Sequence, residues 1–253
     1  MSADVTLYQF PFSTFNEKAR WALDYKRVPH KRVSCLPGPH AGYMTKVSGQ
    51  PQTPVVTFGE QVVAGSAAIV AALDEHFPAK PLLPNDEATR SDVLAMQQRF
   101  DEDLGVRTRR AVVSSLMGDP AYLANMFSTG RPWYVRLSYR WVLPLVLGRM
   151  RERNGITGPE AIEDGMNAIR ESLDLVHEKS QATGYLVGDG FSAADLTACA
   201  HLAPVVNPPD CDMTRPEPMP DTFRQQLDEW AKHPGTDWVR KIYRDHRPPS
   251  SAV

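Results

Sequence analysis

Gln52-Thr53-Pro54-Val55-Val56, followed along the chain by Gly65-Ser66-Ala67-Ala68-Ile69, is the part of the sequence that decides the fold. Pro54 directly precedes an apolar run of β type, where a trans proline would remove a ladder hydrogen bond from an inner strand. A cis Thr53–Pro54 bond would instead turn the chain just before the strand. It would also leave the backbone N–H and C=O of Thr53 free to pair with an extended, peptide-like ligand. An ordinary trans proline at a strand start is the alternative, and this stretch alone does not decide between the two.

The segment around this proline alternates strand and helix patterns. Its strands show alternating apolar residues, and its helices show apolar residues three and four positions apart. Gly59 and Glu60 separate two of the strands, which is typical of a β-hairpin. The predicted elements are strands at residues 5–10, 30–35, 55–58 and 61–64 and helices at residues 13–27 and 66–77. Residues 36–52 are expected to form a loop, with room for one short helical turn.

Beyond residue 86 the patterns are helical only. Residues 78–86 hold three prolines and few apolar side chains, which predicts a linker between two domains. We therefore expect a first domain at residues 1–79 and an all-helical second domain at residues 87–247. The helices are predicted at residues 87–116, 134–153, 158–183, 192–202, 221–232 and 234–246, and residues 248–253 are expected to be frayed.

The composition is typical of a cytosolic globular protein. Of the 253 residues, 42% are hydrophobic and 23% are charged, and the net charge of −2 argues against nucleic acid as a partner. Three cysteines without a CxxC pair, and seven histidines without HxxxH or HExxH, predict a reducing compartment and no metal. The polar residues 1–4 predict no signal peptide. Residues 133–147 are too short and too charged to span a bilayer, so no membrane partner is expected.

Four stretches form a pattern in a fixed order. They are Phe-Pro-Phe-Ser-Thr-Phe-Asn-Glu-Lys-Ala-Arg at residues 10–20, Thr53-Pro54-Val55-Val56, Gly65-Ser66-Ala67-Ala68-Ile69, and Gly184-Tyr185-Leu186-Val187-Gly188-Asp189 with Ser192-Ala193-Ala194-Asp195. Together they resemble the cytosolic glutathione transferase family. The resemblance implies an α/β plus all-α fold, with an N-terminal thioredoxin-like domain followed by an all-helical C-terminal domain. It also implies a cytoplasmic homodimer with glutathione as co-substrate and an active site between the domains.

Ser13 stands at the start of the first predicted helix. The unpaired N–H groups and the dipole at that helix end favour an anion, and a serine hydroxyl can donate a hydrogen bond to a thiolate. Both effects stabilise the charged sulfur, so they lower the pKa of a thiol from its usual value of about 8.5. The resemblance implies that Ser13 activates the glutathione thiol, with Thr14 as the alternative if the register differs by one residue. A plain helix N-cap is the other interpretation of Ser13. The absence of cysteine from this turn disfavours glutathione-disulfide exchange.

Ser66 starts the second helix of this segment, where its hydroxyl and the helix N–H groups form an anion site for the glutamyl end of glutathione. A capping role for Ser66 is the alternative. The family commonly has an acidic residue before this serine, whereas this chain has Gly65, and an unpaired ammonium there would cost about 1–3 kcal/mol. Asp101 or Asp103 could supply the charge from the same or a partner subunit. The expected glutathione contacts are Gln52, Thr53, Pro54, Gly65 and Ser66.

The second substrate, a small hydrophobic electrophile, is expected between the domains. For each residue of its pocket, core packing or a solvated helix face is the alternative interpretation. The predicted pocket residues are Phe12, Phe15, Arg107, Arg110, Tyr134 and Trp141. By their rough position in the family, His40 and Lys46 could contact the other carboxylate of the ligand, but a solvated loop is the favoured interpretation for both. Asp195, which forms a capping box with Ser192, is expected to be structural. Residues 115–160 are longer than the family core requires, and a lid is the only role that the pattern suggests.

Two functions remain open from the sequence. The first is a glutathione-transferase-like enzyme, as in detoxification, that adds the glutathione thiol to the electrophile. The second is a non-catalytic or other-thiol-using member of the fold that binds apolar ligands or protein partners. The intact Ser13 turn favours the enzyme, and Gly65 favours the alternative. The sequence identifies neither the electrophile nor the reaction among conjugation, isomerisation, peroxide reduction and dehalogenation.

Overall fold

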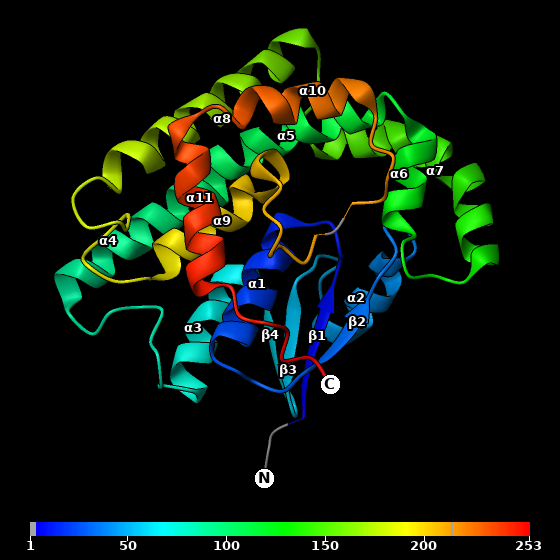
Figure 1. The fold of residues 1–253 in the computed structure, drawn as a ribbon. Helices are drawn as coiled ribbons and strands as arrows, with labels where there is room; N and C mark the ends of the chain where they lie inside the picture. Colours follow the sequence, from blue (N-terminus) through cyan, green and yellow to red (C-terminus); the bar gives the residue numbers. More distant parts are fainter. Residues whose placement is uncertain (1–3, 214) are drawn as a thin grey trace.

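A four-stranded mixed sheet forms the N-terminal part of the molecule in the computed structural model, which describes residues 4–213 and 215–253 (Figure 1). The strands lie in the order β2-β1-β3-β4, with β1 parallel to β2 and antiparallel to β3, and with β3 antiparallel to β4. Their bounds are β1 Val5–Gln9, β2 Lys31–Ser34, β3 Val55–Phe58 and β4 Gln61–Ala64. The helices of this part are α1 Thr14–Tyr25, α2 His40–Ser48 and α3 Ser66–His76.

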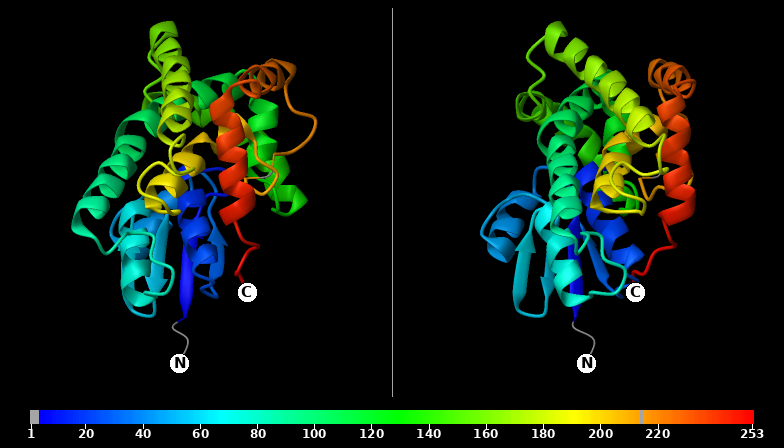
Figure 2. Two further views of the ribbon diagram at one scale, coloured as in Figure 1. Left: turned by 60° about the vertical axis from the view of Figure 1, so that its left-hand side comes forward. Right: turned by 90° about the vertical axis from the view of Figure 1, so that its left-hand side faces the viewer.

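The alternation of side chains along the strands gives the sheet two apolar faces. Leu7 and Val56, which pair across β1 and β3, belong to the main core together with residues of α1 and α3. The next pair, Tyr8 and Val55, points to the opposite face and packs with Met44 of α2. Figure 2 shows α2 on one side of the sheet and α1 and α3 on the other. Both faces of the sheet are therefore covered by helices.

The C-terminal part is helical and is built around α9, Ala193–Val206 (Figure 1). All of the residues of α9 except Pro204 are buried, because the helix packs against α1, α4, α5 and α11. The other helical segments are α4 Glu87–Gln98, the π-helical turn η1 Arg99–Leu104, α5 Gly105–Met117, α6 Pro120–Phe127, α7 Trp133–Arg153, α8 Pro159–Lys179, α10 Asp221–Trp230 and α11 Pro234–His246. The predicted fold class, a thioredoxin-like unit followed by an all-helical unit, is confirmed.

A buried capping box fixes the start of α9. The Ser192 hydroxyl accepts the N–H of Ala194 at 3.2 Å, and the Asp195 carboxylate accepts the N–H groups of Ser192 at 2.9 Å and Leu186 at 2.8 Å. Burial raises the pKa of Asp195 to about 6, although these hydrogen bonds act in the opposite direction. The structural role predicted for Asp195 is confirmed by these contacts.

Two predictions about secondary structure are wrong. Residues 40–48 form helix α2 instead of a loop, because Met44 is fully buried against the sheet. The single helix predicted over residues 87–116 is interrupted by η1, whose wider turn accommodates the close approach of Gly105 to His201.

The end of the chain also departs from expectation. Residues 248–253 were expected to fray, but the backbone N–H of Ser251 donates to the Asp24 carboxylate at 2.7 Å. The N–H of Val253 donates to the carbonyl of His30 at 3.0 Å, beside β2. Residues 1–3, which belong to the polar start discussed above, and residue 214 lie outside the described residues.

Residues 119–154 form an arm that consists of α6 and α7, and the helix α6 was not predicted. The two helices pack on each other at the edge of the molecule (Figure 1). The arm meets the N-terminal part through the Tyr139 hydroxyl, which donates to the Pro37 carbonyl at 2.9 Å, and through Arg131, which donates to the Ser34 carbonyl. The arm therefore lies beside the connection between β2 and α2. Within the described ranges no helix is both long and apolar enough to cross a bilayer.

Candidate functional site

Ser13 lies at the N-terminus of α1, in the turn that follows β1. Its backbone is extended, with φ −134° and ψ 128°, and its carbonyl accepts the N–H of Glu17 at 2.8 Å. The side chain is half-buried and forms no capping hydrogen bond. Ser13 is thus the N-cap by backbone geometry only. Its hydroxyl stays available to a ligand at the positive end of the helix dipole.

Asn16 joins α1 to the turn that contains Pro54. Its fully buried side-chain amide donates to the Thr53 hydroxyl at 3.2 Å. Thr14 is buried as well, and its hydroxyl has no hydrogen-bond partner in the described part of the chain. Buried polar atoms are rarely left unpaired. The start of α1 therefore offers two unbonded hydroxyls, those of Ser13 and Thr14.

The Thr53–Pro54 peptide bond is cis, which is the first of the two alternatives for Pro54. The backbone N–H and C=O of Thr53 form no hydrogen bond with any residue that the structure describes. Both groups can therefore pair with a peptide-like ligand. Gln52 is exposed next to them, and its own N–H is taken by the side chain of Gln50 at 2.6 Å.

Gly65 connects β4 to α3 and has a φ of +93°, with its N–H donating to the Pro54 carbonyl at 3.0 Å. A residue with a side chain rarely adopts this backbone conformation. A Cβ at this position would meet no atom within 4 Å, so conformation and not space selects glycine here. Ser66, which follows, is buried in the first turn of α3, where the unpaired N–H groups of a helix start lie.

A buried polar network lies behind this site and links the two parts of the molecule. The Lys18 ammonium of α1 binds one carboxylate oxygen of Asp101 in η1 at 2.5 Å. The other oxygen of Asp101 meets Nε2 of His201 in α9 at 3.0 Å. Burial alone would raise the pKa of Asp101, but the His201 hydrogen bond and the Lys18 charge hold it below the ordinary value.

This network takes up Asp101, and Asp103 lies outside it. Asp101 uses both oxygens internally, so the expectation that it could supply the charge missing at Gly65 is wrong. Asp103 is exposed and lies 3.4 Å from the guanidinium of Arg107 on the next helical turn. The candidate carboxylates in this helix are therefore engaged with cations of their own chain.

The predicted pocket residues of α5 have other partners. Arg107 binds Asp164 of α8 at 2.7 Å, and Arg110 binds the same carboxylate at 2.8 Å. These contacts give both arginines a structural role between α5 and α8, and contact with a second substrate stays a prediction. The predicted Phe15 packs edge-on against the His201 ring, with a centroid distance of 4.7 Å.

Arg109 is the arginine of α5 that reaches Phe15, and the sequence reasoning missed it. Its guanidinium carbon lies 5.8 Å from the centroid of the Phe15 ring, and its Nε is buried without a hydrogen-bond partner among the described residues. Burial, followed by the nearby Arg110 charge, lowers its pKa. Arg109 is one residue before Arg110 and two residues after Arg107, so on a helix of 3.6 residues per turn its side chain points in a different direction from theirs. This offset is the only signal in the sequence that could have identified Arg109.

Tyr134 and Trp141 of α7, both predicted to line the pocket, lie on the solvent side of the arm. Trp141 is 78% exposed and Tyr134 is 60% exposed. The inner side of α7 is formed by Tyr139 and Leu143 instead. Whether a substrate reaches either aromatic ring stays a prediction.

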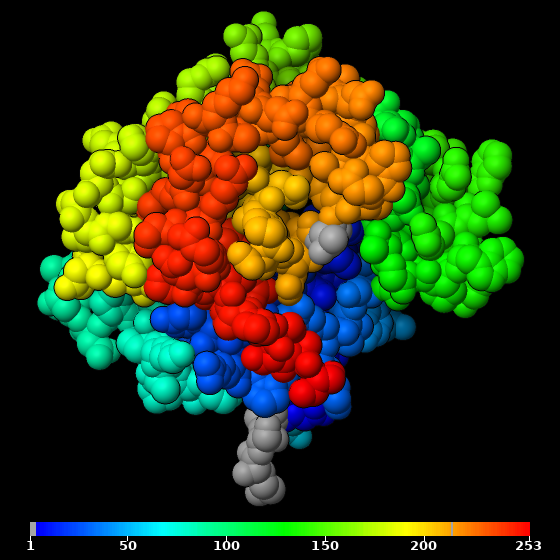
Figure 3. Space-filling view, in the orientation of Figure 1, coloured from blue at the N-terminus to red at the C-terminus, as the bar shows by residue number. Residues whose placement is uncertain are grey.

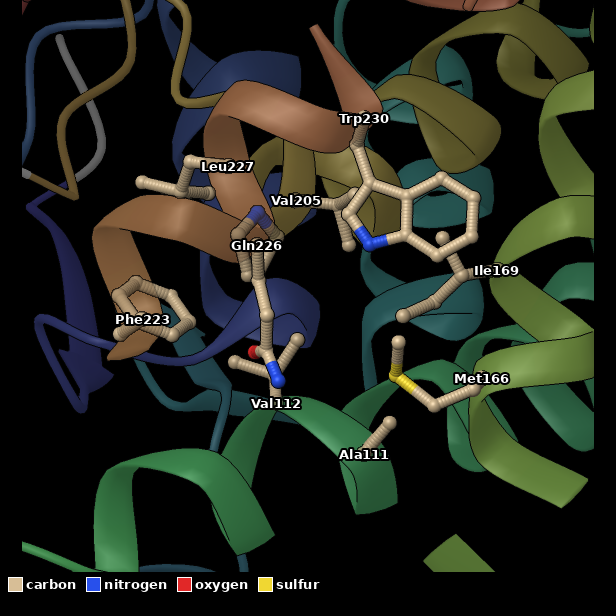
Figure 4. A pocket seen from close by; sticks show the side chains of 10 residues that line it. Ala111, Val112, Met166, Ile169, Val205, Phe223, Gln226, Leu227 and Trp230 are labelled. Carbon is tan, nitrogen blue, oxygen red and sulfur yellow. The ribbon is translucent and has the colours of Figure 1, made fainter. Parts of the chain in front are cut away.

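His40 is buried and does not lie in a solvated loop as expected. It begins α2, and its ring packs edge-on against Phe10 with a centroid distance of 4.6 Å. Lys46, on the same helix, is exposed. A small apolar cavity lies elsewhere, among α5, α8, α9 and α10 (Figure 4). Its lining, which includes Val112, Met166 and Trp230, contains none of the predicted site residues within the described chain.

A comparison with known protein families identifies the N-terminal part. The model described as glutathione S-transferase, N-terminal domain, matches residues 7–81, which run from β1 past α3 and include Ser13 and the cis-proline turn. This part of the chain therefore resembles a glutathione S-transferase N-terminal domain. The Ser13 turn and the cis-proline turn quoted from the sequence lie where the described residues leave a hydroxyl and backbone groups without hydrogen-bond partners.

Similar proteins extend this likeness along the chain. FtsZ-localized protein A of Caulobacter vibrioides is 26% identical over 207 residues, which are 80% of this chain and 78% of that protein. Glutathione S-transferase 1 of Dianthus caryophyllus is 35% identical over 88 residues, which are 34% of this chain and 40% of that protein. A solved glutathione S-transferase from Methylobacillus flagellatus KT with glutathione bound has a TM-score of 0.60 at 18% identity, covering 97% of this chain and 100% of the other.

The candidate site consists of hydroxyl, amide and backbone groups. Among the residues that the structure describes, no group of three or more His, Cys, Asp or Glu side chains is arranged to hold a metal ion. The groups that could hold glutathione are the Ser13 hydroxyl, the Thr53 backbone and the start of α3 at Ser66.

Proposed function

We propose that this protein is a glutathione-transferase-like enzyme that activates the thiol of glutathione for attack on a small hydrophobic electrophile. The observation that carries the proposal is the Ser13 hydroxyl, which stands at the start of α1 without a capping partner. The hydrogen bond from Asn16 to Thr53 joins that helix to the turn with the free Thr53 backbone, which supports a single site for the hydroxyl and the backbone groups. Glutathione-bound relatives of this fold support the choice of thiol.

In the proposed reaction the cysteinyl backbone of glutathione pairs with the N–H and C=O of Thr53, next to Gln52. The Ser13 hydroxyl donates a hydrogen bond to the sulfur, and the dipole of α1 adds to the stabilisation of negative charge. The thiol proton leaves to solvent, and the thiolate forms a carbon–sulfur bond while the electrophile releases its leaving group or accepts the electron pair. The glutamyl carboxylate binds at the start of α3, at Ser66.

The remaining parts of the proposal follow the family. Residues 1–79 would be the thiol-binding domain and residues 87–247 the domain for the second substrate, with the pocket beside Phe12 and Phe15. We propose a homodimer in the cytoplasm, with a small-molecule electrophile as the partner substrate. Gly65 leaves the glutathione ammonium without a carboxylate, so the affinity is expected to be modest, with a Kd of about 1 mM.

The test is a pair of hydroxyl deletions read by calorimetry and by conjugation of a model electrophile. Ser13→Ala removes a hydrogen bond to a charged sulfur worth about 1.5–3 kcal/mol, so the rate at neutral pH should fall by about 10- to 100-fold. The bound thiol pKa should rise by about one to two units. Ser66→Ala should weaken glutathione binding without changing the thiol pKa.

Thr14→Val is the matched control, because it removes the neighbouring hydroxyl, which has no partner in the described chain. Activity retained in Thr14→Val and lost in Ser13→Ala supports the proposal. The reverse result assigns the role to Thr14. An unchanged rate and thiol pKa in both variants would refute the activation of a thiol at this helix end.

A second candidate function is a non-catalytic member of the fold that binds a protein partner. Two observations favour it, namely the glycine at position 65 and the 26% identity to FtsZ-localized protein A, a relative whose name states an association with FtsZ. Calorimetry separates the two functions. Saturable glutathione binding that depends on Ser66 supports the enzyme, whereas no binding together with no conjugation supports the protein-binding alternative.

A further inference from the structure

The outer side of α7 is an unusual apolar surface. Of the ten large apolar side chains exposed within residues 4–213 and 215–253, six lie on this helix. Trp133 is 75% exposed, Trp141 is 78% exposed and Leu145 is 82% exposed. We call these six side chains the arm surface. They are Trp133, Tyr134, Leu137, Trp141, Val142 and Leu145.

Helical spacing places the arm surface on one side of α7. Trp133, Leu137, Trp141 and Leu145 follow one another at intervals of four residues, so their side chains form a stripe along the helix. Tyr139 and Leu143 lie on the opposite side and are buried. The helix is therefore apolar on both sides, and only its inner side is covered. Exposed apolar patches of this kind mark interaction sites.

The polar residues that border the arm surface are almost all cationic. Between residues 133 and 153 the chain has five arginines and a single acidic residue, Glu152. The arginines are all exposed. They are Arg136, Arg140, Arg149, Arg151 and Arg153. The occupant of the surface must therefore be apolar and anionic at the same time.

A second copy of this chain fits that requirement poorly. In a two-fold symmetric contact the same patch meets itself, so the arginines of one α7 would lie against those of the other. Like charges brought together in an interface are costly. An anionic phospholipid surface has no such conflict. Exposed tryptophan and tyrosine favour the headgroup level of a bilayer, and arginine is attracted to anionic lipids while its stem lies on apolar chains.

The shape of the arm agrees with a lipid surface. Figure 3 shows the arm, coloured green, at the edge of the molecule. The exposed side of a single helix is convex, so a flat surface can lie along it. We propose that α7 binds the surface of anionic phospholipid membranes, lying along the interface without crossing the bilayer. This departs from the expectation of no membrane partner, which rested on the absence of a spanning segment.

Tryptophan fluorescence provides a direct readout, because Trp133 and Trp141 are exposed while Trp21, Trp230 and Trp238 are buried. The full chain would be titrated with vesicles of phosphatidylglycerol and, separately, of phosphatidylcholine. With phosphatidylglycerol we expect a blue shift of the emission and co-sedimentation of the protein, and both should weaken as salt is added. With phosphatidylcholine alone binding should be much weaker.

Two variants test the two parts of the surface by co-sedimentation. Trp133→Ser with Trp141→Ser should lower the partition coefficient at least tenfold, since two large side chains no longer enter the interface. Arg140→Glu should lower it about fivefold or more on phosphatidylglycerol and have little effect on phosphatidylcholine. Leu94→Ser and Arg244→Glu, at exposed sites of α4 and α11, are the controls and should bind like the parent.

Three results would overturn the proposal. The first is an absence of binding to phosphatidylglycerol vesicles at low salt with the parent protein. The second is a dimer in sedimentation velocity that the double tryptophan variant converts to a monomer, because the arm surface would then be covered by a second copy. Equal binding by the parent and by both arm variants would place any lipid contact elsewhere on the molecule.

Discussion

Replacing Asp101 by asparagine is the sharpest test of how the two parts of the molecule are held together. The Lys18 ammonium is fully buried and lies 2.5 Å from a carboxylate that is itself only 12% exposed. Asparagine keeps the size of the side chain and a hydrogen bond to His201, but it removes the charge that compensates Lys18. The lysine then stays buried without a counter-ion or gives up its proton.

The loss of stability in Asp101→Asn can be worked out for each state of Lys18, charged or neutral. Leaving one partner of a buried ion pair uncompensated costs about 3–5 kcal/mol. Deprotonating a lysine of ordinary pKa 10.5 at pH 7 costs about 1.4 kcal/mol for each of roughly 3.5 pH units, or about 5 kcal/mol, which sets the upper limit. Burial already lowers the pKa of Lys18 in the parent, so the true value should lie below that limit. We expect Asp101→Asn to lower the free energy of unfolding by about 3–4 kcal/mol.

Urea unfolding followed by circular dichroism measures this change. The double variant Lys18→Met with Asp101→Asn should recover most of the loss, because no buried charge remains. Asp164→Asn is the matched control, since it removes the ion pairs of Arg107 and Arg110 at an aspartate that is 41% exposed, and it should cost about 1 kcal/mol or less. If Asp101→Asn were as mild as Asp164→Asn, the reasoning about the buried lysine would be wrong.

Two further predictions concern the thiol site and pH. Gly65→Glu should lower the free energy of unfolding by about 1–3 kcal/mol, because glutamate is strained at a φ of +93°. The same variant should increase the affinity for glutathione about tenfold, because the new carboxylate pairs with the glutathione ammonium. Urea unfolding measures the first effect and calorimetry the second, and weaker glutathione binding would contradict the second. Burial lowers the pKa of four histidines, so below about pH 6.5 the unfolded chain binds more protons than the folded one and the free energy of unfolding falls as pH falls. Each histidine changes the free energy of unfolding by up to about 1.4 kcal/mol per pH unit. Asp195, whose pKa is raised to about 6, acts in the opposite direction and offsets the effect of one histidine. Urea midpoints that stay constant between about pH 7.5 and about pH 5.5 would contradict the predicted loss of stability. The histidines are His30, His40, His201 and His246.

The sequence predicts best the elements that local chemistry determines. The hairpin strands at 55–58 and 61–64 and the helix at 234–246 have the predicted bounds, because alternation, a glycine turn and a proline at a helix start mark their ends. The capping box of α9 is recognisable for the same reason, since its members are three residues apart. The cis state of Pro54 needed the family resemblance in addition.

Contacts between distant residues could not be predicted in this way. Lys18 and Asp101 are 83 positions apart and Asp101 and His201 are 100 apart, so no local pattern connects them. The arm shows a second limit. Apolar residues occur all around α7, and periodicity alone does not tell which side is buried, so Trp141 was assigned to a pocket although the fold leaves it exposed. Arg109, and not Arg107, points toward Phe15 because of the rotation of α5 about its own axis, and tertiary packing sets that rotation.

The buried charges of α1 bear on which of the two functions the chain performs. Four ionisable residues of this helix, Glu17, Lys18, Arg20 and Asp24, are almost fully buried. Buried ion pairs often contribute no more stability than apolar residues of the same volume, but they require one specific geometry. A helix held this way keeps its N-terminus, and therefore Ser13, in a fixed position, which a preorganised thiolate site needs and a passive binding surface does not. The double variant Lys18→Met with Asp101→Asn tests whether the buried network positions Ser13. A stable variant that binds glutathione but no longer lowers the pKa of its thiol would indicate that it does. A thiol pKa equal to that of the parent would leave the network with a purely structural role.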